Sequence, residues 1–248
     1  MLCLLFGLVK DFNARCFCFR TMLKAVIFDF DDTLVKSGEV SYLNHCRTAK
    51  KLGWPKPPYA VFLKHWGKPW HAMITALFPS HDVNAFIDTY SKVRVGSRYP
   101  LIPGALDALN FLHERHIELG ILSNKPTEQL RERIRHTALN PKIFSFIFGE
   151  QSTMYKKPDS RAFDEVVYSF RTHYIRRHEM LFVGDLTVDF FTARGAGIDF
   201  CGVLSGFHSK SAFVRAGADP SHLIPSVRSL PEWLVENRYV KPAHGEGF

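Results

Sequence analysis

The stretch Ala25-Val-Ile-Phe-Asp-Phe-Asp-Asp-Thr33 decides the fold of this chain. Its first four residues form an uninterrupted apolar run, which is typical of a strand buried on both faces of a parallel sheet, and we expect this strand to extend over residues 25–30. Two carboxylates, Asp29 and Asp31, follow the run directly. Because side chains alternate along extended backbone, both carboxylates can face the same cavity. The stretch therefore predicts a parallel sheet with a chemical site at the carboxyl end of its first strand.

The rest of the chain alternates between apolar runs and helical patterns. Further buried strands are predicted at 118–122, 146–148 and 180–183, with a weaker one at 198–203. Helical patterns separate them and begin at Pro103-Gly104, at Thr127, at Pro158-Asp159 and near Val188. This alternation predicts an α/β fold with a Rossmann-like three-layer core, in which helices cover both faces of a parallel sheet.

The interval between the first and second strands breaks this rhythm. Residues 83–93 carry apolar side chains at the spacing of an amphipathic helix, and no buried strand is evident in the interval. We therefore expect a small helical insert. The expected organisation is a poorly ordered leader at 1–21, an α/β core built from 22–37 and 99–236, the helical insert at 38–98, and a tail at 237–248.

The composition is that of a folded globular chain. Of its 248 residues, 46% are hydrophobic and 23% are charged, which excludes a mostly disordered chain. No apolar stretch reaches the ~18 residues of a membrane span. The net charge of +8 favours anionic partners such as phosphate esters, nucleic acids or acidic membranes. The five cysteines lack the dense, even pattern of a disulfide scaffold, so we expect free thiols and a cytoplasmic location.

Other reactive side chains follow the predicted strands or precede a helix: Ser123, Asn124, Lys157, Asp185 and Asp189. Because the carboxyl ends of parallel strands share one edge of a sheet, these side chains should converge on Asp29 and Asp31. One of these two carboxylates can attack phosphorus, and the other can protonate the leaving oxygen and later activate water. Three carboxylate oxygens suit Mg²⁺, and a hydroxyl and an ammonium suit phosphoryl oxygens. The set is complete for phosphoryl transfer through an aspartyl phosphate.

The order of these motifs resembles that of the haloacid dehalogenase superfamily. The matching residues are Asp29-x-Asp31-x-Thr33, Ser123, Lys157 before Pro158, and Gly184-Asp185-x-x-x-Asp189, within about residues 22–234. The resemblance implies that Asp29 is the nucleophile and Asp31 the general acid/base. It implies that Asp29, Asp185 and the backbone carbonyl of Asp31 bind Mg²⁺, with Asp189 acting close by. It also implies that Ser123, Asn124 and Lys157 bind the transferring phosphate.

The helical insert is similar to the small cap of phosphoglycolate phosphatase-like members of that superfamily. Gly67-Lys68-Pro69 lies where cap loops of this subgroup approach the substrate, which makes Lys68 a candidate specificity residue. An acid at position 31 is typical of phosphatases and mutases rather than dehalogenases. Asp32 departs from the pattern, because Gly is commoner there. We expect its side chain to point away from the phosphate while its N–H faces the site.

Several candidate residues have a purely structural alternative. Ser123 also suits a helix N-cap, and Asp189 suits the first turn of a helix, where a carboxylate interacts favourably with the helix dipole. Lys156 could take the place of Lys157. Lys68 is equally well explained as an exposed lysine.

Two classes of function remain open from the sequence. The first is a Mg²⁺-dependent phosphatase for a small phosphorylated metabolite, nominally 2-phosphoglycolate, with other phosphate monoesters, a nucleotide or pyrophosphate as further substrates. A sugar phosphomutase is its enzymatic alternative. The second class is a non-catalytic binding protein that uses its positive charge. For the enzyme we expect a monomer or homodimer with no membrane or nucleic acid partner, because the basic repeats with interleaved aromatic residues that bind single strands are missing.

Overall fold

The computed structural model describes residues 22–241 and has a six-stranded parallel sheet at its centre, with the strand order β3-β2-β1-β4-β5-β6. The strands are β1 (Ala25–Phe28), β2 (Glu118–Leu122), β3 (Phe144–Phe148), β4 (Met180–Gly184), β5 (Asp199–Val203) and β6 (Leu223–Ile224). Strand β1 lies in the middle, between β2 and β4. The segments that follow these three strands therefore lie side by side.

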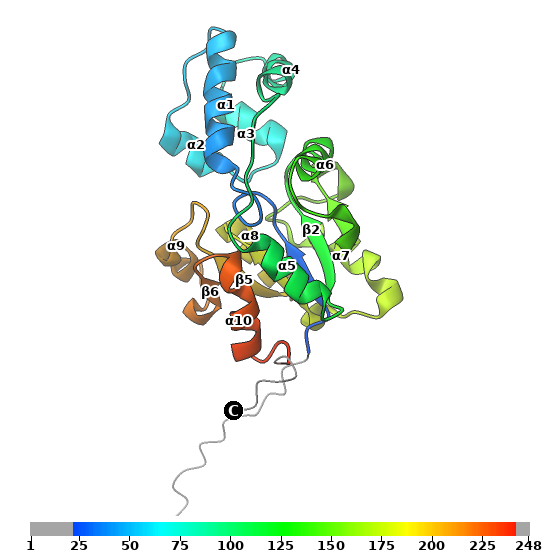
Figure 1. Ribbon diagram of the computed structural model, residues 1–248. Coiled ribbons are helices and arrows are strands. Elements are labelled where there is room, and N and C mark those ends of the chain that lie inside the picture. The colour runs from blue at the N-terminus through cyan, green and yellow to red at the C-terminus, as the bar shows by residue number, and fades with distance from the viewer. Residues whose placement is uncertain (1–21, 242–248) are drawn as a thin grey trace, which may run out of the picture.

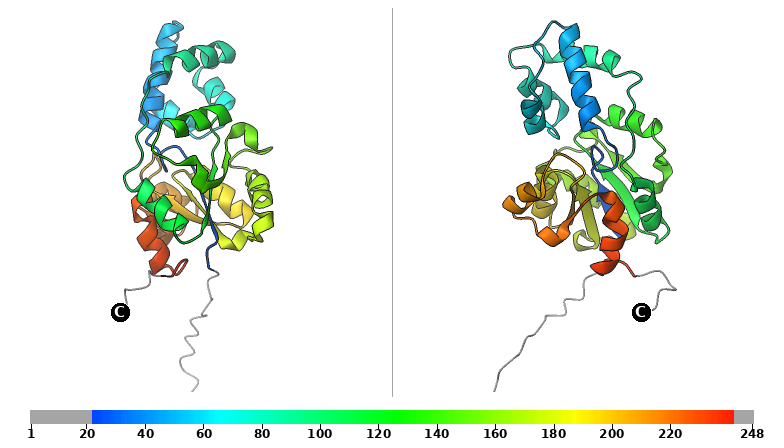
Figure 2. Two further views of the ribbon diagram at one scale, coloured as in Figure 1. Left: turned by 45° about the vertical axis from the view of Figure 1, so that its right-hand side comes forward. Right: turned by 60° about the vertical axis from the view of Figure 1, so that its left-hand side comes forward.

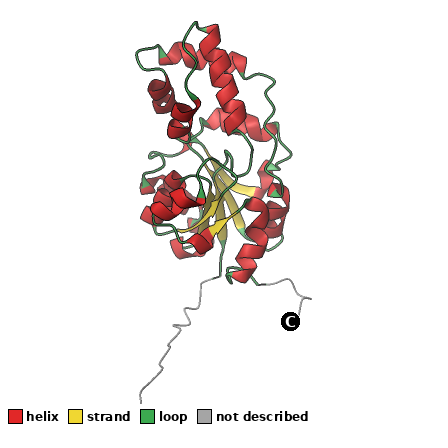
Figure 3. Cartoon of the chain, turned by 90° about the vertical axis from the view of Figure 1, so that its left-hand side faces the viewer, coloured by secondary structure: helices red, strands yellow, loops and turns green. Residues whose placement is uncertain are grey.

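Helices cover both faces of the sheet, which Figure 3 shows with its strands between two helical layers. On one face, α5, α6 and α10 pack against Val26 and Phe28, and on the other α7, α8 and α9 pack against Ala25 and Ile27. All four residues of β1 are buried, which explains its unbroken apolar run. The bounds of these helices are α5 Ala105–His113, α6 Thr127–Arg135, α7 Asp164–Ser169, α8 Thr187–Ala196, α9 Lys210–Arg215 and α10 Leu230–Glu236.

Four further helices gather at one end of the molecule, as Figures 1 and 2 show. They are α1 (Gly38–Lys51), α2 (Tyr59–His65), α3 (Trp70–Leu77) and α4 (Val83–Val93). These helices share a hydrophobic cluster of their own, built largely from Phe62, Ile74, Phe86 and Tyr90. Leu186, which follows β4 in the core, joins this cluster. We call the four helices and their connections the cap.

The predicted α/β fold is confirmed, with differences at the ends of elements. The first strand ends at Phe28, two residues earlier than predicted, and β3 begins at Phe144. The helix predicted from Pro158-Asp159 is divided, with a 3₁₀ turn at Ser160–Phe163 before α7. Other 3₁₀ turns connect the elements at Pro141–Ile143, Glu150–Ser152, Arg171–His173, Arg177–Glu179, Pro220–His222 and Val227–Ser229.

The tail predicted from residue 237 begins later. Tyr239 and Val240 are buried in the core, and the amide of Leu23 donates to the carbonyl of Tyr239 at 3.1 Å. The ring of Tyr239 packs against Trp233 with 5.1 Å between centroids, so the last turn of the core extends past α10. The predicted leader at 1–21 and the remaining tail at 242–248 lie outside the described residues. Within 22–241, no helix is both long and apolar enough to cross a membrane.

Candidate active site

The candidate site lies at the carboxyl ends of β1, β2 and β4. Asp29 follows β1, and its amide donates to the carbonyl of Val183 in β4 at 2.8 Å. Ser123 follows β2, and its amide donates to the carbonyl of Phe148 at 2.9 Å. Asp185 directly follows β4. The pairing of Asp29 and Ser123 beyond their strands, and the place of Asp185 directly after β4, bring three predicted site residues to one edge of the sheet.

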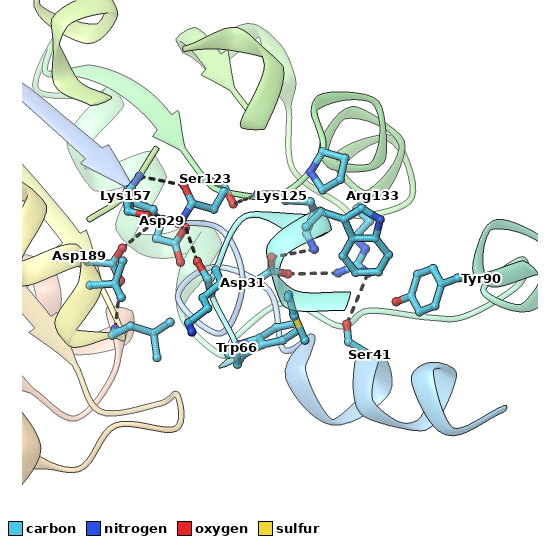
Figure 4. A pocket seen from close by; sticks show the side chains of 18 residues that line it. Asp29, Asp31, Ser41, Trp66, Tyr90, Ser123, Lys125, Arg133, Lys157 and Asp189 are labelled. Carbon is cyan, nitrogen blue, oxygen red and sulfur yellow. Dashed lines mark hydrogen bonds and ion pairs between the residues drawn. The ribbon is translucent and has the colours of Figure 1, made fainter. Parts of the chain in front are cut away.

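Lys157 lies between two carboxylates of this edge (Figure 4). Its Nζ donates to Oδ1 of Asp29 at 2.9 Å and to Oδ1 of Asp189 at 2.6 Å. Burial raises the pKa of Asp29 to about 7, against the opposing effect of the Lys157 ammonium. Burial alone would lower the pKa of Lys157, but the two carboxylates outweigh it and raise this pKa above its usual value. The neighbouring Lys156 donates instead to the carbonyl of Thr153.

Three carboxylates are close enough to share a metal ion. One oxygen each from Asp29, Asp185 and Asp189 lies within 4.8 Å of the others. Oδ2 of Asp185 is buried without a hydrogen-bond partner among the described residues, and burial raises the pKa of this group well above its usual value. A buried carboxylate oxygen without a donor favours a cation, and hard oxygen donors suit Mg²⁺. The residues present therefore fit the predicted ion. Asp189 belongs to the same cluster as Asp29 and Asp185, so it could contact the ion directly.

The carboxylate of Asp31 is turned away from this cluster. Its Oδ2 binds Nζ of Lys125 at 2.8 Å and its Oδ1 accepts from Nη1 of Arg133 at 3.1 Å, while the Ser37 hydroxyl also donates to Oδ1. Burial would raise the pKa of Asp31, but Lys125 and Arg133 outweigh it and hold this pKa below its usual value. The side chain is thus anionic at neutral pH, and the backbone carbonyl remains as the Mg²⁺ ligand that the resemblance implies.

Asp32 adopts a positive φ of 56°, a conformation that aspartate tolerates better than most residues. Its Oδ1 accepts from the amides of Ser37 and Gly38 at 2.9 and 3.1 Å, and its Oδ2 accepts from the indole of Trp66 at 3.2 Å. Burial, and next the charge of Asp31, raises the pKa of Asp32 to about 6. The side chain therefore ties the loop after β1 to the cap, and Asp32 is not among the residues that line the pocket. Its N–H does not face the site as expected, because it donates to the carbonyl of Val35 at 2.7 Å.

Asn124 joins three segments around the pocket. Its amide nitrogen donates to the carbonyls of Gly67 at 2.9 Å and Lys157 at 2.8 Å, and its oxygen accepts from the amide of Lys157 at 3.0 Å. Ser123 lines the pocket and its Oγ accepts from the amide of Lys125 at 3.2 Å. Ser123 is not a helix N-cap, since Pro126 occupies that position in α6.

The cap closes over the pocket and supplies part of its wall. Trp66, Trp70 and Met73 line it from the cap side, and the amide of Trp70 donates to Oε2 of Glu150 in the core at 3.4 Å. Lys68 also borders the pocket, but it is exposed and its Nζ lies 2.9 Å from Nδ1 of His65. Its role in specificity remains a prediction.

Comparison with known proteins identifies the family. A family model described as haloacid dehalogenase-like hydrolase matches residues 26–203. The chain belongs to this family. Phosphoglycolate phosphatase of Pseudomonas putida is 24% identical over 225 residues, which cover 85% of this chain and 79% of that protein. Phosphoglycolate phosphatase of Rhodospirillum rubrum is 29% identical over 229 residues, 86% of this chain and 91% of that protein.

The fold of this haloacid dehalogenase-like hydrolase also occurs among solved structures. That of a "predicted phosphoglycolate phosphatase" from Haemophilus somnus superposes with a TM-score of 0.75 at 19% identity, covering 85% of this chain and 97% of the other. The family model confirms the superfamily that the motifs suggested, and the likeness to phosphoglycolate phosphatases agrees with the predicted subgroup.

Sequence reasoning missed the positive end of the pocket in this hydrolase. Lys125 and Arg133 are buried and contact Asp31, and Ser41 and Tyr90 from the cap lie beside Arg133 in Figure 4. Residues 127–136 read as a charged helical pattern, and such charges are usually solvated. The available signal was the spacing of Arg133 from Leu130 and Ile134, which places it on the buried side of α6.

Proposed function

We propose that this hydrolase is a Mg²⁺-dependent phosphatase that acts on a small phosphate monoester, nominally 2-phosphoglycolate, through a phosphoryl group on Asp29. The observation that carries the proposal is the position of Asp29 at the end of β1. It is buried beside the Lys157 ammonium and in one cluster with the carboxylates of Asp185 and Asp189. A nucleophilic carboxylate needs this kind of positive and metal-binding surrounding, because the substrate is itself an anion.

Asp29 attacks phosphorus, and the bond from phosphorus to the leaving oxygen breaks. Bound Mg²⁺ would be held by Asp29, Asp185 and Asp189 and would offset the negative charge of the phosphoryl oxygens. Lys157 supplies a fixed positive charge beside Asp29, and Ser123 a hydroxyl. Asn124 holds the backbone of Lys157 in place through two hydrogen bonds.

Asp31 moves the protons of the two steps. An arriving phosphate dianion adds negative charge beside Asp31 and raises its pKa, which favours the protonated form that donates to the leaving oxygen. The carboxylate left behind then removes a proton from the water that hydrolyses the phosphoryl-aspartate. The cap closes the pocket through Trp66, Trp70 and Met73 and so limits access of bulk water and the size of the leaving group.

Phosphate release from a panel of phosphorylated metabolites tests the proposal. The panel includes 2-phosphoglycolate, sugar phosphates, nucleotides and pyrophosphate, each measured with Mg²⁺ and with excess chelator. We expect the wild type to release phosphate only with Mg²⁺, and we expect the turnover of Asp29→Asn to be lower by more than about 1,000-fold. Full activity in chelator, or a tenth of the wild-type turnover in Asp29→Asn, would refute the proposed site.

A further inference from the structure

We propose that Arg133, Lys125, Ser41 and Tyr90 form a second anion-binding subsite, which selects substrates whose leaving group carries a carboxylate next to the ester-bearing carbon. The inference deepens the proposed function and rests on it, since it names the class of phosphate monoester that this site accepts. Asp29 and Lys157 lie at one end of the pocket and these four residues lie at the other (Figure 4).

Arg133 is held in the pocket wall rather than on the surface. Its side chain is 3% exposed, and its guanidinium carbon lies 3.8 Å from the ring centroid of Tyr99. Nη1 donates to Oδ1 of Asp31 at 3.1 Å, and Nη2 reaches Oγ of Ser41 at 3.5 Å. Its Nε is buried without a hydrogen-bond partner among the described residues. A buried donor without a partner is costly, so this side chain has capacity for a further acceptor.

At this end of the pocket, two cations contact the same carboxylate. Lys125 and Arg133 both contact Asp31, and the two cationic side chains are 7% and 3% exposed. One carboxylate cannot neutralise two cations, and the other carboxylates that line the pocket, Asp29 and Asp189, bind Lys157. Isolated buried charges are strongly unfavourable, so this end of the pocket favours one more anion.

The position of Asp31 fixes where that anion lies on the substrate. Asp31 must reach the leaving oxygen to protonate it, and the same carboxylate touches Lys125 and Arg133. The atoms that follow the leaving oxygen therefore lie beside the two cations. A carboxylate attached to the first carbon would reach them, and apolar side chains such as Met73 and Pro126 also line the pocket.

A carboxylate also matches the donors that are present. The guanidinium of Arg133 is a planar fork that binds carboxylates with two parallel hydrogen bonds. The indole nitrogen of Trp70, another residue of the pocket wall, is buried and has no partner within residues 22–241. The hydroxyl of Tyr90, which lies on the buried face of α4, lines the same end.

Two substrates with the same number of carbons test this inference: 2-phosphoglycolate and ethyl phosphate, which lacks the carboxylate. The readout is the ratio of their kcat/KM values. In the wild type we expect this ratio to favour phosphoglycolate by about 30-fold or more, which corresponds to the free energy of one hydrogen bond between charged groups. Arg133→Met should reduce the ratio by at least about tenfold, even though both rates fall as Asp31 loses a partner. Lys125→Met repeats the test if Arg133→Met does not fold.

Arg135→Met is the matched control, because Arg135 lies on the same helix but is exposed and pairs with Glu128. It should leave the ratio unchanged. If Arg133→Met lowers both rates equally, Arg133 only positions Asp31 and the subsite is refuted.

Calorimetric binding of both compounds to Asp29→Asn with Mg²⁺ separates this inference from the proposed function. If Asp29→Asn binds phosphoglycolate more tightly than ethyl phosphate, and the added Arg133→Met substitution abolishes this preference, the subsite is supported even if wild-type turnover fails. If Asp29→Asn binds both compounds equally, the subsite is overturned.

Discussion

Asp29 has to be ionised to attack phosphorus, but its surroundings disfavour an anion. Burial raises its pKa to about 7, and Lys157 is the described group that counters this most strongly. A single ammonium thus serves two carboxylates, Asp29 and Asp189, inside the protein. Removing one partner of a buried ion pair leaves an uncompensated charge, which costs far more than the pair itself contributes.

Lys157→Met should therefore lower both stability and activity. We expect the free energy of unfolding to fall by about 3 kcal/mol and turnover to fall by about 100-fold or more, because two carboxylates lose their counter-charge. Chemical denaturation and phosphate release measure the two effects. Lys156→Met is the matched control, since its ammonium binds a backbone carbonyl of Thr153, and it should lose less than about 1 kcal/mol. Equal losses in both variants would contradict the position given to Lys157.

The sequence predicted the residues of the catalytic centre better than those of the pocket wall. Asp29 and Asp185 directly follow strands, so the sheet alone brings them together, and Lys157 stands before the helical segment that begins at Ser160. Arg133 lies in the last turn of α6, where its spacing from Leu130 and Ile134 is the one local sign that it is buried. Only the packing of α6 against the sheet and the cap turns this side chain into the pocket.

At the scale of elements, the loop between α2 and α3 carries the contact that closes the pocket. Gly67 has a φ of 84°, and its carbonyl accepts from Asn124 in the core. A Cβ at this position would overlap the side chain of Leu186, which follows β4. The loop can approach the core this closely only because position 67 has no side chain.

Gly67→Ala should weaken closure of the cap. We expect a rise in KM and a fall of kcat by about tenfold for a small phosphate monoester, because the methyl group collides with Leu186 and the loop moves outward. Gly53→Ala is the matched control, since Gly53 also has a positive φ, of 72°, but has no atom within 4 Å of the added Cβ. It tests backbone strain alone. Identical kinetics in the two variants would contradict the assigned contact.

His45 in α1 gives the cap a titratable core residue. Burial lowers its pKa to about 4, its Nδ1 lies 2.6 Å from the carbonyl of Ser41, and its Nε2 has no partner in the described chain. Between pH 6.5 and about 4 the unfolded chain binds a proton that the folded chain excludes. The contribution of His45 to the free energy of unfolding is therefore fully present above pH 6.5. It falls by about 3 kcal/mol as the pH falls through this window.

His45→Phe should remove this dependence of stability on pH, because phenylalanine keeps an aromatic ring at this position but has no group that titrates. The measurement is the free energy of unfolding of both proteins from pH 7 to pH 4, and the difference between them isolates His45 from the other titrating groups. We expect the wild type to lose more stability than the variant on acidification. Parallel curves would show that His45 is not buried in its neutral form.

The elements that sequence reasoning missed are the short ones. The bounds predicted for strand β2 are the observed ones, since the run from Leu119 to Leu122 is buried in the sheet. Strand β6 has only two residues and gives no readable pattern. Helix α2 is a seven-residue helix after Pro58, with one buried residue, Phe62, so tertiary packing rather than periodicity defines it.

At the scale of the whole molecule, polar contacts join the cap to the core. The indole of Trp66 donates to Asp32 at 3.2 Å, and Arg94 pairs with Glu132 at 2.6 Å. The clustered carboxylates lie beneath this junction, in the core. Mg²⁺ bound there would offset their mutual repulsion and would bind the folded chain only, so it should stabilise the molecule.

Added Mg²⁺ should raise the melting temperature of the wild type without any substrate. We expect a rise of a few degrees at saturating Mg²⁺, and none in Asp185→Asn, which loses a proposed ligand. Asp107→Asn, an exposed carboxylate in α5, is the control and should respond like the wild type. A Mg²⁺ response that persists unchanged in Asp185→Asn would place the ion elsewhere.

The most direct test of the central claim is the capture of a phosphoryl group on Asp29. Asp31→Asn lacks the base for hydrolysis of the intermediate, and p-nitrophenyl phosphate has a leaving group that needs no proton. With Mg²⁺, we expect a rapid release of one nitrophenolate per chain followed by slow turnover. Mass spectrometry of the quenched protein should then find one phosphoryl group on the peptide that contains Asp29. Slow turnover without a burst, and a protein of unchanged mass, would contradict the account.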